Sequence, residues 1–299
     1  MSDWPADPVP WLVAIVAVAA YAIAWRAVNA KHPASPIPAW RLAAWLGGWL
    51  AILGALASPI DTLADDLLTA HMGQHLLLAM VAPPLLALGA PVLVLLRIST
   101  PGVRSRFVLP ALHSRLVRFS SSPLLAWLLF TIVMWATHFT PIYEAALENE
   151  QLHVMEHMAF LATGCLFWWH VVGADPMPRR LGFVPRQAYV LAQMPVNAAV
   201  GLVIYFAPTL LYAHYAVAAP ARGINAMTDQ QIGGLVMWGV GDVLLLASFV
   251  ALVAAWMRVE LRRQERGGRL ASTGSLARTP DAHDSQALPD PARAARQRT

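Results

Sequence analysis

Residues 70–80 read AHMGQHLLLAM and place His71 and His75 four positions apart at the start of a long apolar run. Residues 151–161, QLHVMEHMAFL, repeat this arrangement with a second pair of histidines. Residues four apart share one face of an α-helix, so each stretch predicts a helix that presents two imidazoles toward one point. Burying a histidine side chain in the hydrocarbon of a membrane costs free energy, so two such pairs in apolar helices require a structural or functional explanation.

The composition predicts an all-α membrane protein. The chain has 299 residues, of which 58% are hydrophobic and 13% are charged, whereas a soluble domain carries about 25% charged residues. Apolar runs of about 20 residues, long enough to cross a bilayer as helices, recur along the chain. We therefore predict a polytopic bundle of seven transmembrane helices in residues 1–257. The predicted spans cover about residues 10–28, 40–57, 66–88, 123–139, 151–173, 187–208 and 230–257.

The remaining segments carry other signals. Residues 1–10 contain no Lys or Arg, so we expect no secretory signal peptide. Pro83 and Pro84 are expected to kink or end the third span, because neither nitrogen can donate to the helix ladder. Residues 92–119 interleave arginines with apolar residues and are predicted to lie along the membrane surface. Residues 258–299 are polar, and we expect a disordered basic tail there.

The basic residues predict the orientation of the chain. If the seven spans are placed as above, 20 of the 21 Lys and Arg residues fall on one side of the membrane, and Arg222 alone falls on the other. The positive-inside rule then places the N-terminus outside and the C-terminus in the cytoplasm. This distribution also explains the basic isoelectric point, so we predict a lipid bilayer and no nucleic acid as partner.

The predicted orientation gathers histidines at the outer membrane face. His153 and His157 lie at the outer end of the fifth span, and His138 ends the fourth span on the same side. Imidazole binds copper, zinc, iron and nickel, and thioether sulfur favours reduced copper. Met134 lies one helical turn from His138, and Met237 lies in the seventh span. Because the chain has a single cysteine, a site of histidines supplemented by methionine predicts copper, in its Cu(I) state, more than zinc.

A structural explanation competes with the metal site for each residue taken alone. A single intramembrane histidine is often a hydrogen-bonded packing residue, and most methionines in a helix bundle fill the core. Three carboxylates are candidates for supporting roles or for handling protons and ions. Asp66 precedes the first histidine pair, Glu156 lies beside His157, and Asp242 lies within the seventh span. For Asp242, a structural hydrogen bond to Asn197 or Gln193 is the rival interpretation.

Three stretches resemble a known family. They are HMGQHLLLAMVAPPLLALGAP (71–91), THFTPIYEAALENEQLHVMEHMAFLATGCLFWWHVVG (137–173) and DQQIGGLVMW (229–238). They are similar to the seven-span CtaG-type cytochrome c oxidase assembly factors, and the likeness extends over residues 40–257. This family helps to insert copper into haem-copper oxidases of the bacterial plasma membrane. The resemblance implies copper-handling roles for His71, His75, His138, His153 and His157, with Met237 a weaker candidate.

The expected function is therefore a non-enzymatic metallochaperone. It would bind copper at the outer face and serve haem-copper oxidase subunits, with a periplasmic copper chaperone as a further partner. Two alternatives stay open. One is a membrane electron carrier with b-type haem held by the paired histidines. The other is an intramembrane zinc hydrolase with a carboxylate as general base. His170, near the inner end of the fifth span, is assigned no role.

Overall fold

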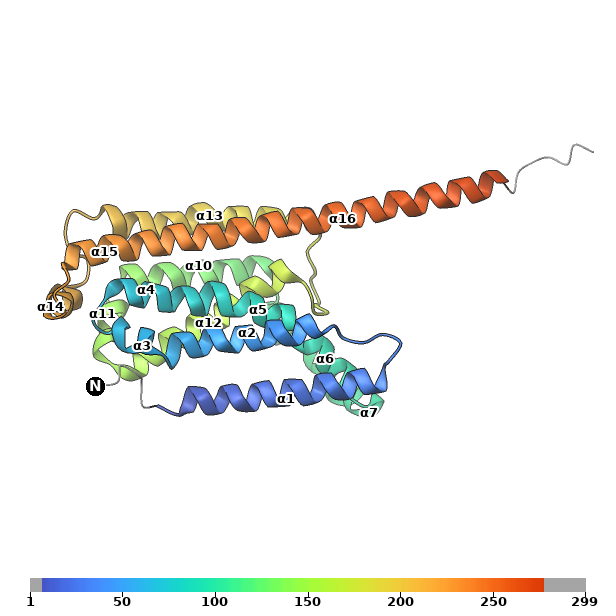
Figure 1. Ribbon diagram of the computed structural model, residues 1–299, viewed down its shortest axis with the longest axis horizontal. Helices are drawn as coiled ribbons and strands as arrows, with labels where there is room; N and C mark the ends of the chain where they lie inside the picture. Colours follow the sequence, from blue (N-terminus) through green and yellow to red (C-terminus); the bar gives the residue numbers. More distant parts are fainter. Residues whose placement is uncertain (1–6, 277–299) are drawn as a thin grey trace, which may run out of the picture. The chain divides into compact units, whose positions relative to one another are not determined.

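A computed structural model describes residues 7–276, and these residues form helices and connecting loops without a β-strand (Figure 1). The first half of the chain contains α1 (Val9–Lys31), α2 (Ala39–Leu56), α3 (Pro59–Ala64), α4 (Leu68–Leu76), the π-helical turn η1 (Leu77–Val81), α5 (Ala82–Gly89), α6 (Pro91–Ile98), α7 (Pro101–Val103), the π-helical turn η2 (Arg104–Val108), α8 (Leu109–Leu112) and α9 (Arg115–Ser120). The second half contains α10 (Pro123–Phe139), α11 (Ile142–Glu148), α12 (Glu150–Val172), α13 (Phe183–Phe206), α14 (Ala213–Ala221), α15 (Ala226–Leu235), the π-helical turn η3 (Val236–Val240) and α16 (Gly241–Leu276).

The membrane character predicted from the composition is confirmed. Among the described residues, five helical stretches are long and apolar enough to cross a membrane: 9–31, 39–56, 68–98, 183–206 and 226–266. A sixth is obtained if α10 and α11, which are bent by 71° relative to each other, count as one span. The predicted span 151–173 coincides with α12, which has 23 residues but carries histidines and glutamates that lower its hydropathy. A count of seven spans therefore stays a prediction.

The two consecutive prolines bend the ladder of hydrogen bonds without ending the helix. The π-helical turn η1 directly precedes Pro83 and Pro84, and the chain continues as α5 to Gly89. Proline cannot donate an N–H and crowds the carbonyl one turn earlier, so a wider turn accommodates it. The helix ends where Ala90 adopts a left-handed backbone conformation, with φ of 51°. Of the two predicted effects, kinking or ending the span, the prolines do not end the helix, which continues with an altered hydrogen-bond ladder to Gly89.

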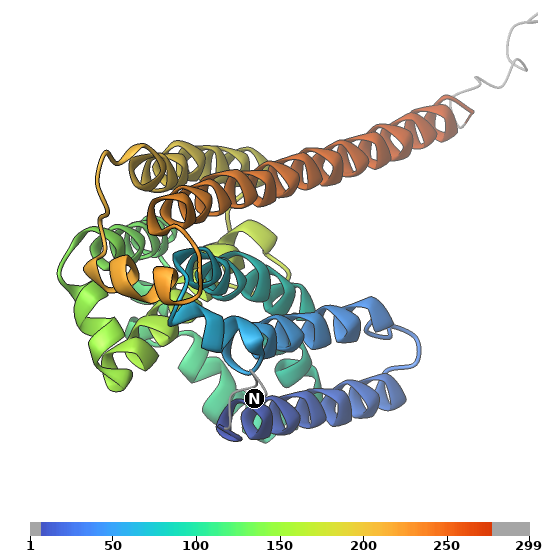
Figure 2. The same ribbon diagram turned by 60° about the vertical axis from the view of Figure 1, so that its left-hand side comes forward.

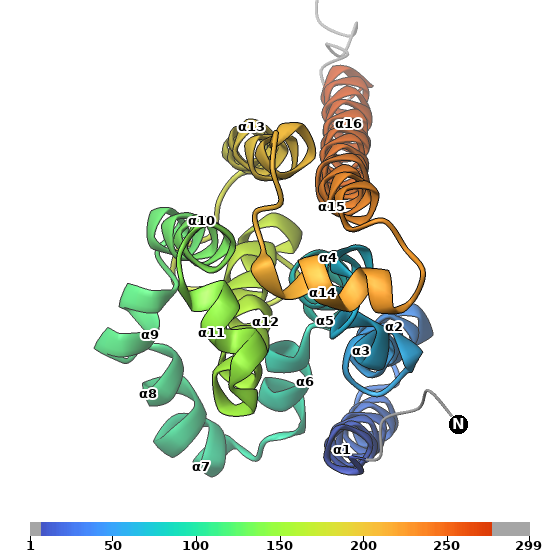
Figure 3. The same cartoon turned by 90° about the vertical axis from the view of Figure 1, so that its left-hand side faces the viewer.

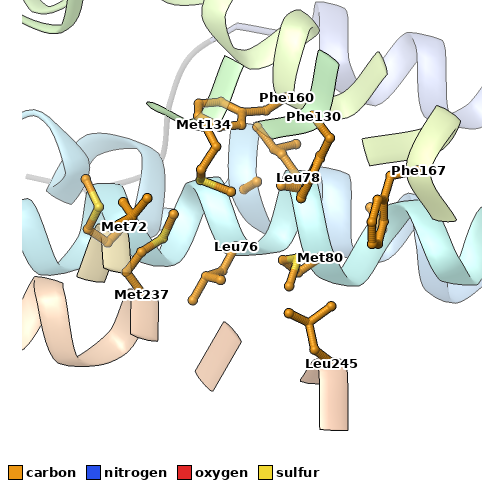
Figure 4. Close-up of a cluster of buried hydrophobic side chains, with 14 of the residues drawn as sticks. Met72, Leu76, Leu78, Met80, Phe130, Met134, Phe160, Phe167, Met237 and Leu245 are labelled. Carbon is orange, nitrogen blue, oxygen red and sulfur yellow. The ribbon is translucent and has the colours of Figure 1, made fainter. Parts of the chain in front are cut away.

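The continuous stretch α4–η1–α5 lies at the centre of the bundle. It packs between α2, α12 and α15, as the view along the bundle shows (Figure 3). In the most apolar part of residues 68–98, half of the residues are buried, compared with 17% of those in the corresponding part of α1. Its side chains Met72, Leu78 and Met80 contribute to a core that also includes Phe130 and Phe167 from neighbouring helices (Figure 4). Because this stretch carries the first histidine pair, its fixed position also fixes that pair.

One hydrogen bond locks α12 onto this central stretch. Pro83 and Pro84 have no N–H to offer, so the carbonyl of Ala79 lacks the helical partner that either could have supplied. The indole nitrogen of Trp168 donates to that carbonyl at 2.9 Å. Gly164, one turn earlier on α12, allows this approach, because a Cβ at that position would lie 2.9 Å from the same oxygen. The prolines that follow Ala79 and the Gly164 and Trp168 side of α12 therefore complement each other at this contact.

A buried carboxylate holds the beginning of α4. Asp229 on α15 accepts hydrogen bonds from the backbone nitrogens of Leu68 at 2.6 Å and Thr69 at 3.2 Å. The first backbone N–H groups of a helix have no partner within the helix, and a carboxylate there also complements the helix dipole. Asp229 thus fixes the start of α4 one turn before His71.

The C-terminal region differs from the prediction. The described residues divide into two compact units at residues 253 and 254, and α16 (Gly241–Leu276) begins in the first unit and ends in the second. The expectation of a disordered tail from residue 258 is corrected for residues 258–276, which continue α16. Leu, Arg, Gln and Glu favour helix, and extending an existing helix needs no new nucleus. Residues 277–299 lie outside the described residues.

We predict that Trp168→Phe lowers the stability of the folded protein. The substitution keeps the aromatic packing but leaves the Ala79 carbonyl without a donor, which costs about 1–3 kcal/mol in a buried setting. Thermal unfolding of the detergent-purified protein, followed by circular dichroism, measures the effect. Trp169→Phe is the matched control, because the neighbouring Trp169 indole nitrogen has no hydrogen-bond partner among the described residues. Equal stability of the two variants would contradict the locking role of Trp168.

Candidate metal centre

The two histidine pairs lie at one end of the bundle, beneath short helices. Figures 1 and 2 show α3, α11 and α14 gathered at the end where α4 begins. Asn149 caps α12 there, accepting hydrogen bonds from the backbone nitrogens of Gln151 and Leu152. The histidines fall within the first three turns of the continuous stretch α4–η1–α5 and of α12, and His138 falls at the end of α10. Three helices therefore bring their histidines to the same end of the bundle.

The five predicted histidines form one cluster, which we call the imidazole cluster: His71, His75, His138, His153 and His157. Within each pair the ring centroids are 4.3 Å apart on α4 and 4.2 Å apart on α12. Between helices, the His71 and His153 rings stack at 5.4 Å, and the His75 and His138 rings lie 5.4 Å apart. Spacing of i, i+4 on two helices thus brings four rings together, and α10 supplies the fifth.

Most of the ring nitrogens in this cluster have no hydrogen-bond partner among the described residues. Six buried nitrogens are unpartnered: Nε2 of all five histidines and Nδ1 of His75. Buried polar groups are normally satisfied, and each exception in a folded protein requires an explanation. Convergent imidazole nitrogens with free lone pairs are the donor set that a transition-metal ion binds. The arrangement therefore fits a metal ion better than it fits a packed polar core.

Hydrogen bonds at the back of two rings leave their Nε2 atoms free. His138 Nδ1 lies 2.6 Å from the carbonyl of Met134, which can only accept, so Nδ1 carries the proton. His71 Nδ1 lies 3.1 Å from the hydroxyl of Tyr215, which itself donates to the carbonyl of Ala64 at 2.8 Å. The Tyr215 oxygen consequently accepts from His71. Partners of this kind fix the tautomer and orientation of metal-binding histidines.

Glu156 adds one carboxylate to the imidazole cluster. Its Oε1 lies 3.8 Å from His75 Nε2, and both of its oxygens are buried without a hydrogen-bond partner among the described residues. Ligand atoms of His71, His153 and Glu156 lie within 4.8 Å of one another. Glu156 is three residues after His153, so the two side chains share a face of α12. The carboxylate predicted as a supporting residue is thus placed as a possible direct ligand.

Aromatic side chains enclose the imidazole cluster. The Phe160 ring lies 4.3 Å from that of His75 and separates the cluster from the apolar core. Tyr143 lies against His71 and His138, with ring centroids at 5.1 and 6.2 Å. A pocket of about 300 Å³ opens beside His138, lined by Tyr143, Glu144 and Tyr212 among others. His153 is the partly exposed member of the cluster, whereas the other four histidines are buried.

Three of the predicted supporting residues lie in other surroundings. Met237 is buried in the hydrophobic core beside Met72, where Figure 4 draws both thioethers. Asp66 pairs with Arg222 at the surface, with 2.6 Å between Oδ2 and Nε. Asp242 accepts a hydrogen bond from Asn197 at 3.1 Å, which is the structural interpretation raised from the sequence. Among the described residues, no hydrogen bond or ion pair joins these three residues to the imidazole cluster.

The sequence analysis missed the tyrosines that surround the cluster. Tyr143, Tyr212 and Tyr215 lie in α11, at the start of α14 and within α14, and all three are buried. Tyr143 donates to Tyr215, and Tyr212 donates to the backbone carbonyl of His138. The sequence does place these tyrosines between apolar runs and an outer loop, which is an available signal. Their contacts with the histidines, however, depend on how the helices pack and can be seen only in the structure. His170, predicted on the other side, is buried at the far end of α12.

The sequence of the chain matches a model of a known protein family. The family model of the cytochrome c oxidase caa3 assembly factors matches residues 19–259. The chain belongs to this family. Two similar proteins, described as uncharacterized, come from Mycobacterium bovis and Mycobacterium tuberculosis; each is 29% identical over 281 residues, covering 91% of this chain. A third, from Mycobacterium leprae, is 29% identical over 278 residues.

The chain spans only 42% of the length of these mycobacterial relatives. No solved structure matches the chain. For this caa3 assembly factor family member, the matched residues 19–259 contain the whole imidazole cluster and Glu156. The cluster therefore lies within the part of the chain that defines the family.

We predict that a partly buried carboxyl group in α3 makes stability depend on pH. Asp61 in α3 accepts a hydrogen bond from Gln74 at 2.7 Å, and Gln74 lies next to His75 on α4. Burial raises the pKa of Asp61 to about 6, although the bond from Gln74 opposes the shift. The folded state therefore holds this proton more tightly than the unfolded state, whose Asp pKa is about 4. The free energy of unfolding should fall as the pH rises between these two values.

Thermal unfolding of wild-type protein and Asp61→Asn at several pH values measures this effect. The variant should lose less stability than wild type between about pH 4 and pH 6, because its amide does not titrate. Asp175, in the loop after α12, provides an independent comparison, because burial raises its pKa to about 6 as well. The double variant should show a smaller dependence still. Parallel curves for wild type and Asp61→Asn would contradict the assignment.

Proposed function

We propose that this chain is a copper-binding assembly factor, a metallochaperone that holds Cu(I) in the imidazole cluster and passes it to a haem-copper cytochrome c oxidase. The observation that carries the proposal is the clustering of five imidazole rings from α4, α10 and α12, each with a buried Nε2 that has no hydrogen-bond partner among the described residues. Family membership supports the oxidase as the recipient. Copper is here the cargo of the protein, so its ligands must both bind it and release it.

The ligand set supports a cation of low charge. Glu156 is the one carboxylate in the candidate ligand group, and the imidazoles bind a metal in their neutral form. An ionised Glu156 balances the charge of a single Cu(I). A second positive charge in these buried surroundings would lack a balancing carboxylate in the group, and uncompensated charge in a low-dielectric interior is costly. The core position of Met237 removes it from the proposed ligand set and leaves a site of nitrogen and oxygen donors.

The orientation of the chain is part of the proposal. We infer an outer position for the end of the bundle that carries the cluster, from the distribution of Lys and Arg over the loops. Copper would then arrive from outside the plasma membrane, either free or on a periplasmic chaperone. The pocket beside His138 provides an opening from the cluster toward a partner, such as the catalytic oxidase subunit.

The two alternatives have weaker support. A b-type haem needs space for a porphyrin between its two imidazoles, but the rings of the cluster contact one another, Phe160 and Tyr143. A zinc hydrolase needs an open coordination position beside a substrate cavity. The nearby pocket is lined by His138 and does not include Glu156, the candidate general base. Neither function uses all five histidines.

We predict that H71A/H75A abolishes Cu(I) binding, because it removes two converging imidazoles from the central helix. Metal analysis of the detergent-purified protein, loaded under reducing conditions and freed of excess copper, measures the stoichiometry. H170A is the matched control: His170 is also a buried histidine, but it lies at the other end of α12. The control should keep about one copper per chain. Unchanged copper in a folded H71A/H75A variant would refute the assignment of the cluster.

We predict that a strain lacking this chain has low cytochrome c oxidase activity, and that added copper partly restores it. The reason is that high external copper can replace assisted delivery by mass action. Oxidase activity in membranes, with haem content measured in parallel, tests this expectation. A plasmid copy of wild type or H170A should restore activity, whereas H71A/H75A should not. Full oxidase activity in the deletion strain would exclude the assembly role while leaving copper binding open.

A further inference from the structure

We propose that the imidazole cluster consists of two overlapping ligand sets that one Cu(I) ion occupies in succession. This inference rests on the proposed function and adds an internal path for the ion. The loading set contains His71, His153 and Glu156, and the release set contains His75, His138 and Glu156. His157 lies between the two sets.

The number of donors motivates two sets. Five imidazoles and a carboxylate exceed the four ligands that a tetrahedral ion takes. The geometry also separates them: ligand atoms of His71, His153 and Glu156 come within 4.8 Å of one another, and His75 and His138 belong to no such group among the described residues. Instead, the ring centroids of His75 and His138 lie 5.4 Å apart, and His75 Nε2 lies 3.8 Å from Glu156 Oε1. One site does not use all of these donors at once.

The two sets meet solvent at different places. On α4, His75 follows His71 by one helical turn, which corresponds to about 6 Å. His153 is partly exposed, whereas His71 and His75 are 0% and His138 is 2% exposed. An ion arriving on the side of His153 therefore meets the loading set first. The release set packs against Phe160 and adjoins, through His138, the pocket of about 300 Å³.

Glu156 is placed to serve both sets. Its carboxylate belongs to the group with His71 and His153, and its Oε1 lies 3.8 Å from His75 Nε2. His157 bridges the sets in a similar way, with ring centroids 6.5 Å from His71 and 6.0 Å from His75. An ion can therefore exchange His71 and His153 for His75 and His138 one ligand at a time. The single carboxylate balances one monovalent cation, which favours one ion moving over two ions bound together.

The test compares two double variants, each of which removes one set. H71A/H153A removes the loading set, and H75A/H138A removes the release set. Each purified full-length variant is loaded with Cu(I), its copper is counted, and the rates of uptake from and loss to a chromogenic Cu(I) chelator are measured. H170A controls for the loss of a buried histidine from α12. Size-exclusion profiles and unfolding temperatures verify folding, and the corresponding His→Gln variants are used if the alanine variants aggregate.

Wild type should bind one copper per chain, and each double variant should still bind one. H71A/H153A should load at least about tenfold more slowly, and H75A/H138A should bind at least about tenfold more weakly, in line with the effect of losing a metal-supporting residue. Adding E156Q should weaken both double variants, because the carboxylate serves both sets. Complete loss of copper from either folded double variant would establish a single site and overturn the proposal. If the wild-type protein binds two copper ions per chain, the two sets are filled together and not in succession, which would overturn the proposal. If the wild-type protein binds no copper, the proposed function itself is wrong.

Discussion

The hydrogen bond from Trp168 to the carbonyl of Ala79 sets the register between the two helices that carry the histidine pairs. Two consecutive prolines deprive that carbonyl of its helical donors, and the π-helical turn before them exposes it toward α12. Gly164 lets α12 approach closely enough for the indole to reach it. Asp229 fixes the beginning of α4 from the opposite side. With the register fixed at these points, the pairs on α4 and α12 face each other instead of pointing in unrelated directions.

The imidazole cluster is an energetic cost to the folded protein without a ligand. A buried polar group that lacks a partner costs about 1–3 kcal/mol, and within the described residues the Nε2 atoms of the five histidines and the oxygens of Glu156 have no hydrogen-bond partner. Packing against Phe160 holds the rings in place, together with the hydrogen bonds that His71 donates to Tyr215 and His138 donates to the carbonyl of Met134. A cation that engages several of these atoms relieves the cost without ordering new side chains. The excess of donor atoms also permits release of the cation, because spare imidazoles can replace bound ones one at a time.

Much of the fold could be predicted from the sequence because hydropathy and helical periodicity are local properties. The apolar runs located the long helices, and the i, i+4 spacing showed which imidazoles share a helix face. The sequence did not reveal partners that depend on packing: the tyrosine network, the pairing of Asp66 with Arg222, and the burial of Met237 beside Met72. Nor did it decide whether the helix kinks or ends at Pro83, because local rules allow both outcomes and the donor for the Ala79 carbonyl, Trp168, comes from another helix. The helix beyond residue 258 was missed because polar composition alone does not distinguish an extended helix from coil.

The central claim is that imidazoles from three helices bind one soft cation at this end of the bundle. X-ray absorption spectroscopy of the Cu(I)-loaded, detergent-purified protein tests it most directly, because the spectrum reports the ligand atoms themselves. We predict a coordination shell of nitrogen and oxygen with the multiple-scattering pattern of more than one imidazole. A shell dominated by sulfur, or a protein that retains no copper after loading, would contradict the account.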